Sequence, residues 1–227
     1  MKLFEICSAD QDVRFSPFVW RVIMCLHHKG LPFERVAMTF LETKKLLQTD
    51  TQTVPVLEDG GRQIGDSFKI AKYLEETYPH KPLFDTSKLL DEYQELNLWT
   101  DRTIALGIFR MLVKDIHDLQ DTKNAAYFRK TREARIGKTL EEMHAGREAL
   151  LEEFRDSLTP LRERLVQANF LSGDAPEWFD YCVFGTFQWA RICSDFELLA
   201  DDDSVAIWRG RMLDLFDGYA QGAKLAY

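Results

Sequence analysis

Residues 15–30 read FSPFVWRVIMCLHHKG, and this stretch determines how the chain begins to fold. Serine is favoured just before the first turn of a helix, and proline is favoured at the first helical position. Apolar residues then recur at helical spacing, and Gly30 suits the left-handed conformation that ends many helices. The stretch therefore predicts a helix that begins at Ser16-Pro17 and ends at Lys29-Gly30.

Strand patterns lie on both sides of this helix. Leu3 to Cys7 predicts a short buried strand, and Phe33 to Met38 predicts a second one. Residues 54–64 predict a β-hairpin, and Asp66-Ser67 opens a further helix that Pro79 stops. The resulting order, βαβ followed by ββα, is that of a thioredoxin-like domain.

The remainder of the chain has a helical pattern. Residues 80–87 follow one proline and contain another, which indicates a linker. From Leu89 onward apolar residues recur at helical spacing. The stretch 123–153 is dense in both charge signs and predicts a solvated helical surface. We therefore expect an α+β domain over residues 1–84 and an all-α domain over residues 85–227.

The composition excludes several classes of function. A net charge of −8 makes nucleic acids and anionic membranes poor partners. No apolar run approaches the roughly 20 residues that span a bilayer, and the first residues do not resemble a signal peptide. The 4 cysteines are too sparse for a disulfide framework and lack zinc-ligand spacing. We expect reduced thiols, a cytoplasmic protein and no metal.

Three motifs give the chain a recognisable identity in this order and at this spacing. They are FSPFVWR at residues 15–21, TVPVL at 53–57 and DSFKIAKYL at 66–74. The chain resembles the cytosolic glutathione transferases, whose thioredoxin-like domain is followed by a helical one. The segment SPFVWR, together with HAGRE at 144–148, is most similar to the branch of bacterial β-etherases and related fungal enzymes. The resemblance implies glutathione as co-substrate and possible cleavage of aryl ethers.

Ser16 is the predicted catalytic residue. Only a thiolate is a good sulfur nucleophile, and a free thiol has a pKa of about 8.5. A hydroxyl at a helix N-terminus can donate a hydrogen bond to the glutathione sulfur, and the helix dipole also favours the charged form. Ser16 would then activate the co-substrate without being the nucleophile. Two alternatives stay open: Ser16 is only a helix cap, or Ser8 holds the sulfur instead.

The resemblance also implies a glutathione-binding set. Pro55 is expected to be cis and to expose the Val54 backbone, which would pair with the cysteinyl part of glutathione like an added strand. Asp66 would take the γ-glutamyl amino group, while Ser67 would donate to the γ-glutamyl carboxylate at a helix N-terminus. Gln52 and Lys44 are weaker candidates for the glycyl end.

An apolar substrate must lie beside the sulfur. Aromatic and apolar residues near the first helix, or spaced along the first helix of the second half, could line this site: Phe15, Phe18, Trp20, Trp99, Arg102, Leu106 and Phe109. Such stripes also form ordinary core. The adjacent His27 and His28 diverge on a helix and do not indicate a metal pair.

Three functions therefore remain. The first is a glutathione transferase that attacks a small apolar or aromatic electrophile and, as the resemblance implies, forms a homodimer. The second is a binding protein that carries hydrophobic ligands without chemistry. The third is a partner-binding module, which the intact Asp66-Ser67 pair disfavours.

Overall fold

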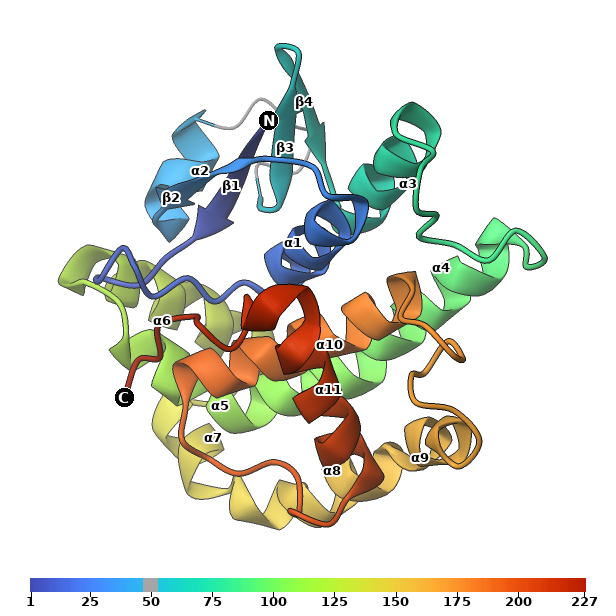
Figure 1. Cartoon of the computed structure of the whole chain (residues 1–227). Coiled ribbons are helices and arrows are strands. Elements are labelled where there is room, and N and C mark those ends of the chain that lie inside the picture. Colours follow the sequence, from blue (N-terminus) through green and yellow to red (C-terminus); the bar gives the residue numbers. More distant parts are fainter. Residues whose placement is uncertain (47–52) are drawn as a thin grey trace.

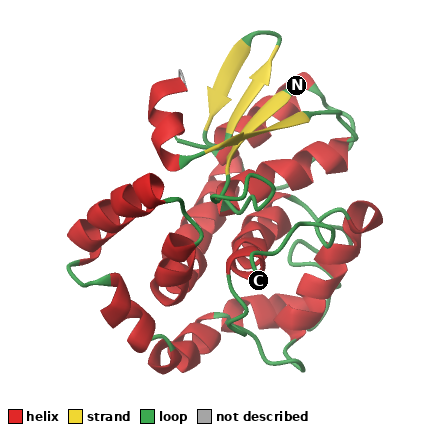
Figure 2. Ribbon diagram, turned by 90° about the vertical axis from the view of Figure 1, so that its left-hand side faces the viewer, coloured by secondary structure: helices red, strands yellow, loops and turns green. Residues whose placement is uncertain are grey.

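The computed structural model describes residues 1–46 and 53–227, with a β-sheet at one end of the molecule and a helical body at the other (Figure 2). The first half contains four strands and three helices. In chain order they are β1 (Lys2–Ile6), α1 (Pro17–Lys29), β2 (Glu34–Met38), α2 (Phe40–Leu46), β3 (Val56–Asp59), β4 (Arg62–Gly65) and α3 (Ser67–Thr77).

The sheet has the strand order β2-β1-β3-β4. β1 and β2 are parallel, with Leu3 opposite Arg35, because α1 crosses over between them. β3 is antiparallel to both β1 and β4, so Leu57 lies opposite Leu3 on one side and Ile64 on the other. This topology confirms the predicted thioredoxin-like domain.

α2 is the one described element of this half that the sequence pattern did not predict. It is short, and Thr43 is buried while Phe40 is half-buried. The preceding residue, Thr39, donates to the Glu42 carboxylate from its N–H at 2.8 Å and from its hydroxyl at 2.9 Å. This local hydrogen bonding, rather than an apolar stripe, starts the helix.

The second half contains helices joined by irregular segments and is arranged around α10 (Figure 1). Its elements are α4 (Leu90–Trp99), the π-helical η1 (Thr100–Ala105), α5 (Leu106–Asp118), α6 (Thr122–Ile136), α7 (Leu140–Ala145), η2 (Glu148–Leu150), α8 (Leu151–Ser157), α9 (Thr159–Leu165), α10 (Trp178–Cys193) and α11 (Ser204–Gly218). The boundary predicted between residues 84 and 85 falls within the segment that connects α3 to α4, and it stays a prediction. Within the described residues, no helix has the length and apolar character needed to cross a bilayer.

The two halves meet where α1 packs against α10 (Figure 1). The approach is close because Gly185 of α10 faces the first turn of α1. A Cβ atom at Gly185 would lie 2.4 Å from the Pro17 carbonyl oxygen. Buried Arg21 adds an ion pair across the junction, with Nη2 2.6 Å from Asp101 Oδ1. The N-terminus of α1 is therefore held by residues from both halves.

Candidate functional site

A cavity of about 510 Å³ opens at the N-terminus of α1. One wall comes from the first half, with Ser16, Lys44 and Val54 among its residues, and the other comes from η1, α5, α6 and α10. Most of the lining is apolar. Its aromatic members are Phe15, Phe18, Phe40, Phe109, Tyr127, Phe128 and Trp189.

Ser16 caps α1 and lines this cavity. Its side chain accepts a hydrogen bond from the Val19 N–H at 3.4 Å, and the residue is only 7% exposed. A hydroxyl that accepts a bond still has its proton to donate. The cap role and a donor role toward a bound group are thus compatible at the positively polarised end of the helix.

Ser8, the alternative to Ser16, is occupied elsewhere. Its hydroxyl donates to the Asp10 carbonyl at 2.9 Å and accepts from the Asp10 N–H at 3.0 Å. Ser8 does not belong to the cavity lining among the described residues. Its hydroxyl therefore closes a local turn.

The chain's own cysteines are poorly suited to supply a thiolate. All four are free and buried. Burial raises the pKa of Cys7 to about 11, and desolvation holds the pKa of Cys25 and of Cys193 well above the ordinary thiol range. A buried thiol stays protonated and inert. A thiolate in this cavity must therefore come from a bound molecule.

The Val54–Pro55 peptide bond is cis, which confirms that prediction. Val54 and Ser16 both line the cavity, while Pro55 is buried and does not border it. Lys44 also lines the cavity, and its Nζ lies 4.7 Å from the centre of the Tyr127 ring. Gln52, the other residue predicted for the glycyl end, lies outside the described residues.

Asp66 and Ser67 stand at the start of α3, as predicted, but neither borders the cavity. Asp66 has a positive φ of 73°, and its Oδ1 accepts from the N–H groups of Phe68 and Lys69 at 3.0 Å. Ser67 is the first helical residue and is buried. The role predicted for this pair stays a prediction.

Four of the seven residues predicted for the apolar site do line the cavity: Phe15, Phe18, Leu106 and Phe109. Trp20 does not, since it is 1% exposed and its Nε1 donates to the Arg14 carbonyl at 3.2 Å. The Trp20 ring packs toward Arg35, whose guanidinium carbon lies 5.3 Å from the ring centre. Trp20 is therefore core on another side of α1.

Trp99 and Arg102 are also displaced from the cavity. Trp99 packs on Phe179, with ring centres 6.4 Å apart, and Arg102 borders a separate hollow of about 220 Å³. The prediction assumed an uninterrupted α-helix, in which both residues share a face with Leu106 and Phe109. η1 begins directly after Trp99, and its π-helical turn rotates the later side chains relative to Trp99. Arg102 lies within η1 and shares the smaller hollow with Leu106, which borders both spaces.

Sequence reasoning missed the far wall of the cavity. α6 contributes Tyr127, Phe128, Arg132 and Arg135, although this stretch predicted a solvated surface. The signal was present in the spacing, because residues 128, 132 and 135 fall on one helical face and combine an aromatic ring with two guanidinium groups. The many charged residues of this stretch led instead to the prediction of a solvated surface.

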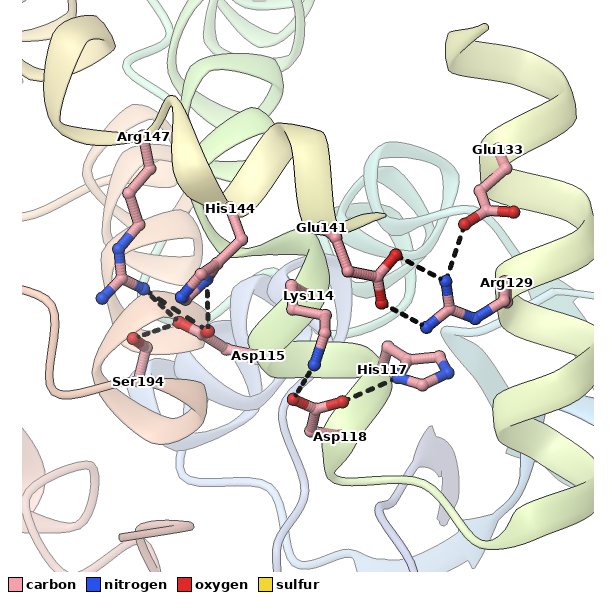
Figure 3. A network of polar contacts seen from close by, with 10 residues as sticks. All are labelled: Lys114, Asp115, His117, Asp118, Arg129, Glu133, Glu141, His144, Arg147 and Ser194. Atoms are coloured by element: carbon pink, nitrogen blue, oxygen red, sulfur yellow. Dashed lines mark hydrogen bonds and ion pairs between the residues drawn. The ribbon is translucent and has the colours of Figure 1, made fainter. Parts of the chain in front are cut away.

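A second group of titratable residues holds helices together (Figure 3). Asp115 of α5 accepts from the Ser194 hydroxyl at 2.5 Å and from Arg147 Nη1 at 3.0 Å, while His144 Nδ1 lies 3.5 Å from its other oxygen. The serine hydroxyl donates to the carboxylate and not to the histidine, so the group does not have the serine–histidine contact of a catalytic triad. These contacts join α5, α7 and the end of α10.

Comparison with known proteins identifies the family. A profile for "Glutathione S-transferase, C-terminal domain" matches residues 96–219, and one for "Glutathione S-transferase, N-terminal domain" matches residues 12–82. The first of these alone spans more than half of the 227 residues. The chain therefore belongs to the glutathione S-transferase family.

Individual relatives cover most of the chain. It is similar to glutathione S-transferase omega-1 of Mus musculus, with 26% identity over 205 residues, 88% of this chain and 74% of the relative. It is also similar to the glutathione S-transferase-like protein ustS of Aspergillus flavus, with 24% identity over 224 residues, 84% of this chain and 80% of the relative.

A solved glutathione S-transferase of Ceriporiopsis subvermispora in complex with glutathione matches the fold. Its TM-score is 0.75 with 20% identity, covering 97% of this chain and 93% of that one. At this identity the likeness establishes the fold alone, a thioredoxin-like domain followed by a helical domain.

Proposed function

We propose that this chain is a glutathione transferase in which the Ser16 hydroxyl donates a hydrogen bond to the glutathione sulfur. The observation that carries the proposal is the position of Ser16, at the N-terminus of α1 and inside a cavity whose lining is mostly apolar. A donor and a helix dipole there both favour the thiolate. All four cysteines are buried and none of them borders the cavity, so the thiolate would come from a bound thiol, for which the family indicates glutathione.

The remaining polar groups that the resemblance implies suit the rest of the tripeptide. The Val54 backbone precedes β3 and is available to pair with an extended peptide. Lys44 offers a cation for the glycyl carboxylate. Asp66 and Ser67, at the N-terminus of α3, offer a carboxylate for the γ-glutamyl amino group and donors for its carboxylate.

The reaction is a nucleophilic displacement. The thiolate sulfur forms a bond to an electrophilic carbon of the acceptor, and the group on that carbon leaves with the bonding electron pair. With an aryl halide the leaving group is chloride; with an aryl ether it is a phenolate, which water protonates. The aromatic lining suits both acceptors, and ether cleavage is the reaction that the motifs of α1 favour.

The test is the variant Ser16→Ala, assayed with 1-chloro-2,4-dinitrobenzene across a range of pH. Loss of a hydrogen bond to a charged group costs about 1.5–3 kcal/mol, so turnover at neutral pH should fall by about 10-fold or more. The pH of half-maximal rate should rise by about one unit or more, as the bound thiol becomes less acidic.

Ser8→Ala is the matched control, because it removes a buried serine hydroxyl close in sequence but away from the cavity. Its pH profile should match that of the unmodified chain. An unchanged profile for Ser16→Ala would refute the role assigned to Ser16. Binding of dinitrophenyl compounds without conjugation of any electrophile would instead favour the ligand-carrying alternative.

The assembly and location expected from the family are also proposals. A homodimer would sediment at twice the mass of the 26.5 kDa chain. The reduced cysteines suggest a cytoplasmic location, and fractionation of the cells that express the protein should then recover it in the cytoplasmic fraction.

A further inference from the structure

The cavity has an uneven charge. Three cationic residues border it, Lys44, Arg132 and Arg135, whereas Asp101 is the one acidic member of the lining that the structure describes. Asp101 is already engaged, with its Oδ1 2.6 Å from Arg21 Nη2. The chain as a whole carries a net charge of −8. An uncompensated positive site in such an acidic protein indicates a negatively charged ligand.

Arg132 is the most constrained of the three cations. Its guanidinium carbon lies 4.4 Å from the centre of the Phe128 ring and 5.2 Å from that of Phe40. Nη1 donates to the Thr131 hydroxyl at 2.8 Å, and buried Nε has no hydrogen-bond partner. Over residues 1–46 and 53–227, no carboxylate lies within ion-pair distance of Arg132.

A half-buried guanidinium without a counter-ion carries a desolvation cost for the fold. Burial lowers the pKa of Arg132 below its usual range, although the group stays charged at neutral pH. The unused Nε–H is part of the planar fork that arginine offers to carboxylates. The group is thus poised to donate to an anion that the chain itself does not supply.

The position of Arg132 associates it with the acceptor end of the cavity. Phe40 contacts both the Arg132 guanidinium and the ring of Phe15, with ring centres 6.3 Å apart, and Phe15 precedes Ser16. Lys44 stands over Tyr127, and Tyr127 also acts on Arg132. An anion at Arg132 would be surrounded by aromatic rings, and Phe40 and Phe15 connect this position to Ser16.

From this arrangement we infer that Arg132 selects the acceptor, and that the acceptor is an aromatic molecule carrying a carboxylate. The inference rests on the proposed transferase function and names its substrate class. Arg132 is a binding and specificity residue, and its guanidinium would hold the carboxylate while the aromatic body stacks among Phe15, Phe40 and Phe109. This contact would fix the orientation of the acceptor, so that its reacting carbon faces the thiolate.

The test uses a matched pair of ligands that differ in one charge, 3,5-dinitrobenzoate and its methyl ester. Calorimetric titration measures their binding to the unmodified chain, to Arg132→Gln and to Arg110→Gln. Arg110 is the control, an exposed arginine that borders the separate smaller hollow. Arg132→Gln should weaken benzoate binding about 10-fold or more and ester binding less than about 2-fold, with no change for Arg110→Gln.

Glutathione binding is measured on the same variants, because its glycyl carboxylate is another possible source of the anion. Arg132→Gln should leave glutathione affinity unchanged. A large loss of glutathione affinity with unchanged benzoate affinity overturns the inference, as does an equal loss for benzoate and ester. The melting temperature of Arg132→Gln should not fall, since a half-buried charge without a counter-ion is removed. If that variant does not fold, Arg132→Lys replaces it and should weaken benzoate binding selectively.

Conjugation of 4-chloro-3,5-dinitrobenzoate and its methyl ester separates this inference from the proposed function. In both, the thiolate displaces chloride from the same ring carbon. An Arg132-dependent preference for benzoate binding with no turnover of either compound would support the anion site and refute the transferase. Turnover of both compounds with the same sensitivity to Arg132→Gln would support the transferase and refute the anion site.

Discussion

Gly185→Ala tests whether the junction of α1 and α10 positions the site. The added Cβ would lie 2.4 Å from the Pro17 carbonyl oxygen, 3.1 Å from Arg21 Cγ and 3.3 Å from Arg21 N. Ordinary contact needs at least 3.4 Å, so the two helices must separate by about 1 Å. The obstructing atom belongs to the backbone, and a change of side-chain rotamer cannot relieve the overlap.

The expected loss of stability is large. Overpacking of a tight interior typically costs 1–3 kcal/mol, and a 1 Å gap forfeits up to about half of the dispersion energy of each separated contact. We expect a loss of about 3 kcal/mol, which corresponds to a melting temperature lower by about 6–12 °C for a chain of this size. Displacement of Pro17 would also move Ser16 and reduce conjugation.

Differential scanning calorimetry provides the measurement, and Gly210→Ala provides the control. Gly210 lies within α11, and a Cβ there would meet nothing within 4 Å. Alanine is favoured over glycine in helices by about 0.8–1.0 kcal/mol, so this variant should melt slightly higher. If the melting temperature of Gly185→Ala equals or exceeds that of the unmodified chain, α1 and α10 are not packed as described.

Two further substitutions test single residues. Ser67→Ala should raise the KM for glutathione by about 10-fold with a smaller effect on kcat, because the γ-glutamyl carboxylate of glutathione loses a hydrogen-bond donor. Steady-state kinetics that show an unchanged KM would exclude that contact. Asp180→Asn should lower the free energy of unfolding by about 2–6 kcal/mol, because the Asp180 carboxylate accepts from Leu171 N and Trp208 Nε1 on one oxygen and from two other N–H groups on the second. Urea denaturation measures this loss, and a midpoint shift no larger than that of exposed Asp214→Asn would contradict the assigned role.

Local sequence signals determined the elements around the site. Ser16, Pro17 and Gly30 specify the limits of α1 through interactions within a few residues, and the structure has the helix at Pro17–Lys29 with Gly30 in the left-handed conformation. The Val-Pro pair and the Asp66-Ser67 helix start were recognisable for the same reason. Capping and turn chemistry act over short distances, so they can be predicted from a single sequence.

The walls of the cavity depended on tertiary structure. Trp20 and Phe18 both lie on α1, yet Trp20 is core and Phe18 borders the cavity, because each side chain is covered by elements that are distant in the sequence. The π-helical turn of η1 separates Trp99 from Leu106 in a way that no apolar pattern marks. The inward face of α6 places Arg132 against Phe40, which is about ninety residues away along the chain, and only the packing of α6 against α2 brings them into contact. The sequence alone therefore determined the limits of α1 and the start of α3, whereas the burial and partners of each side chain required the folded structure, because they depend on contacts between remote segments.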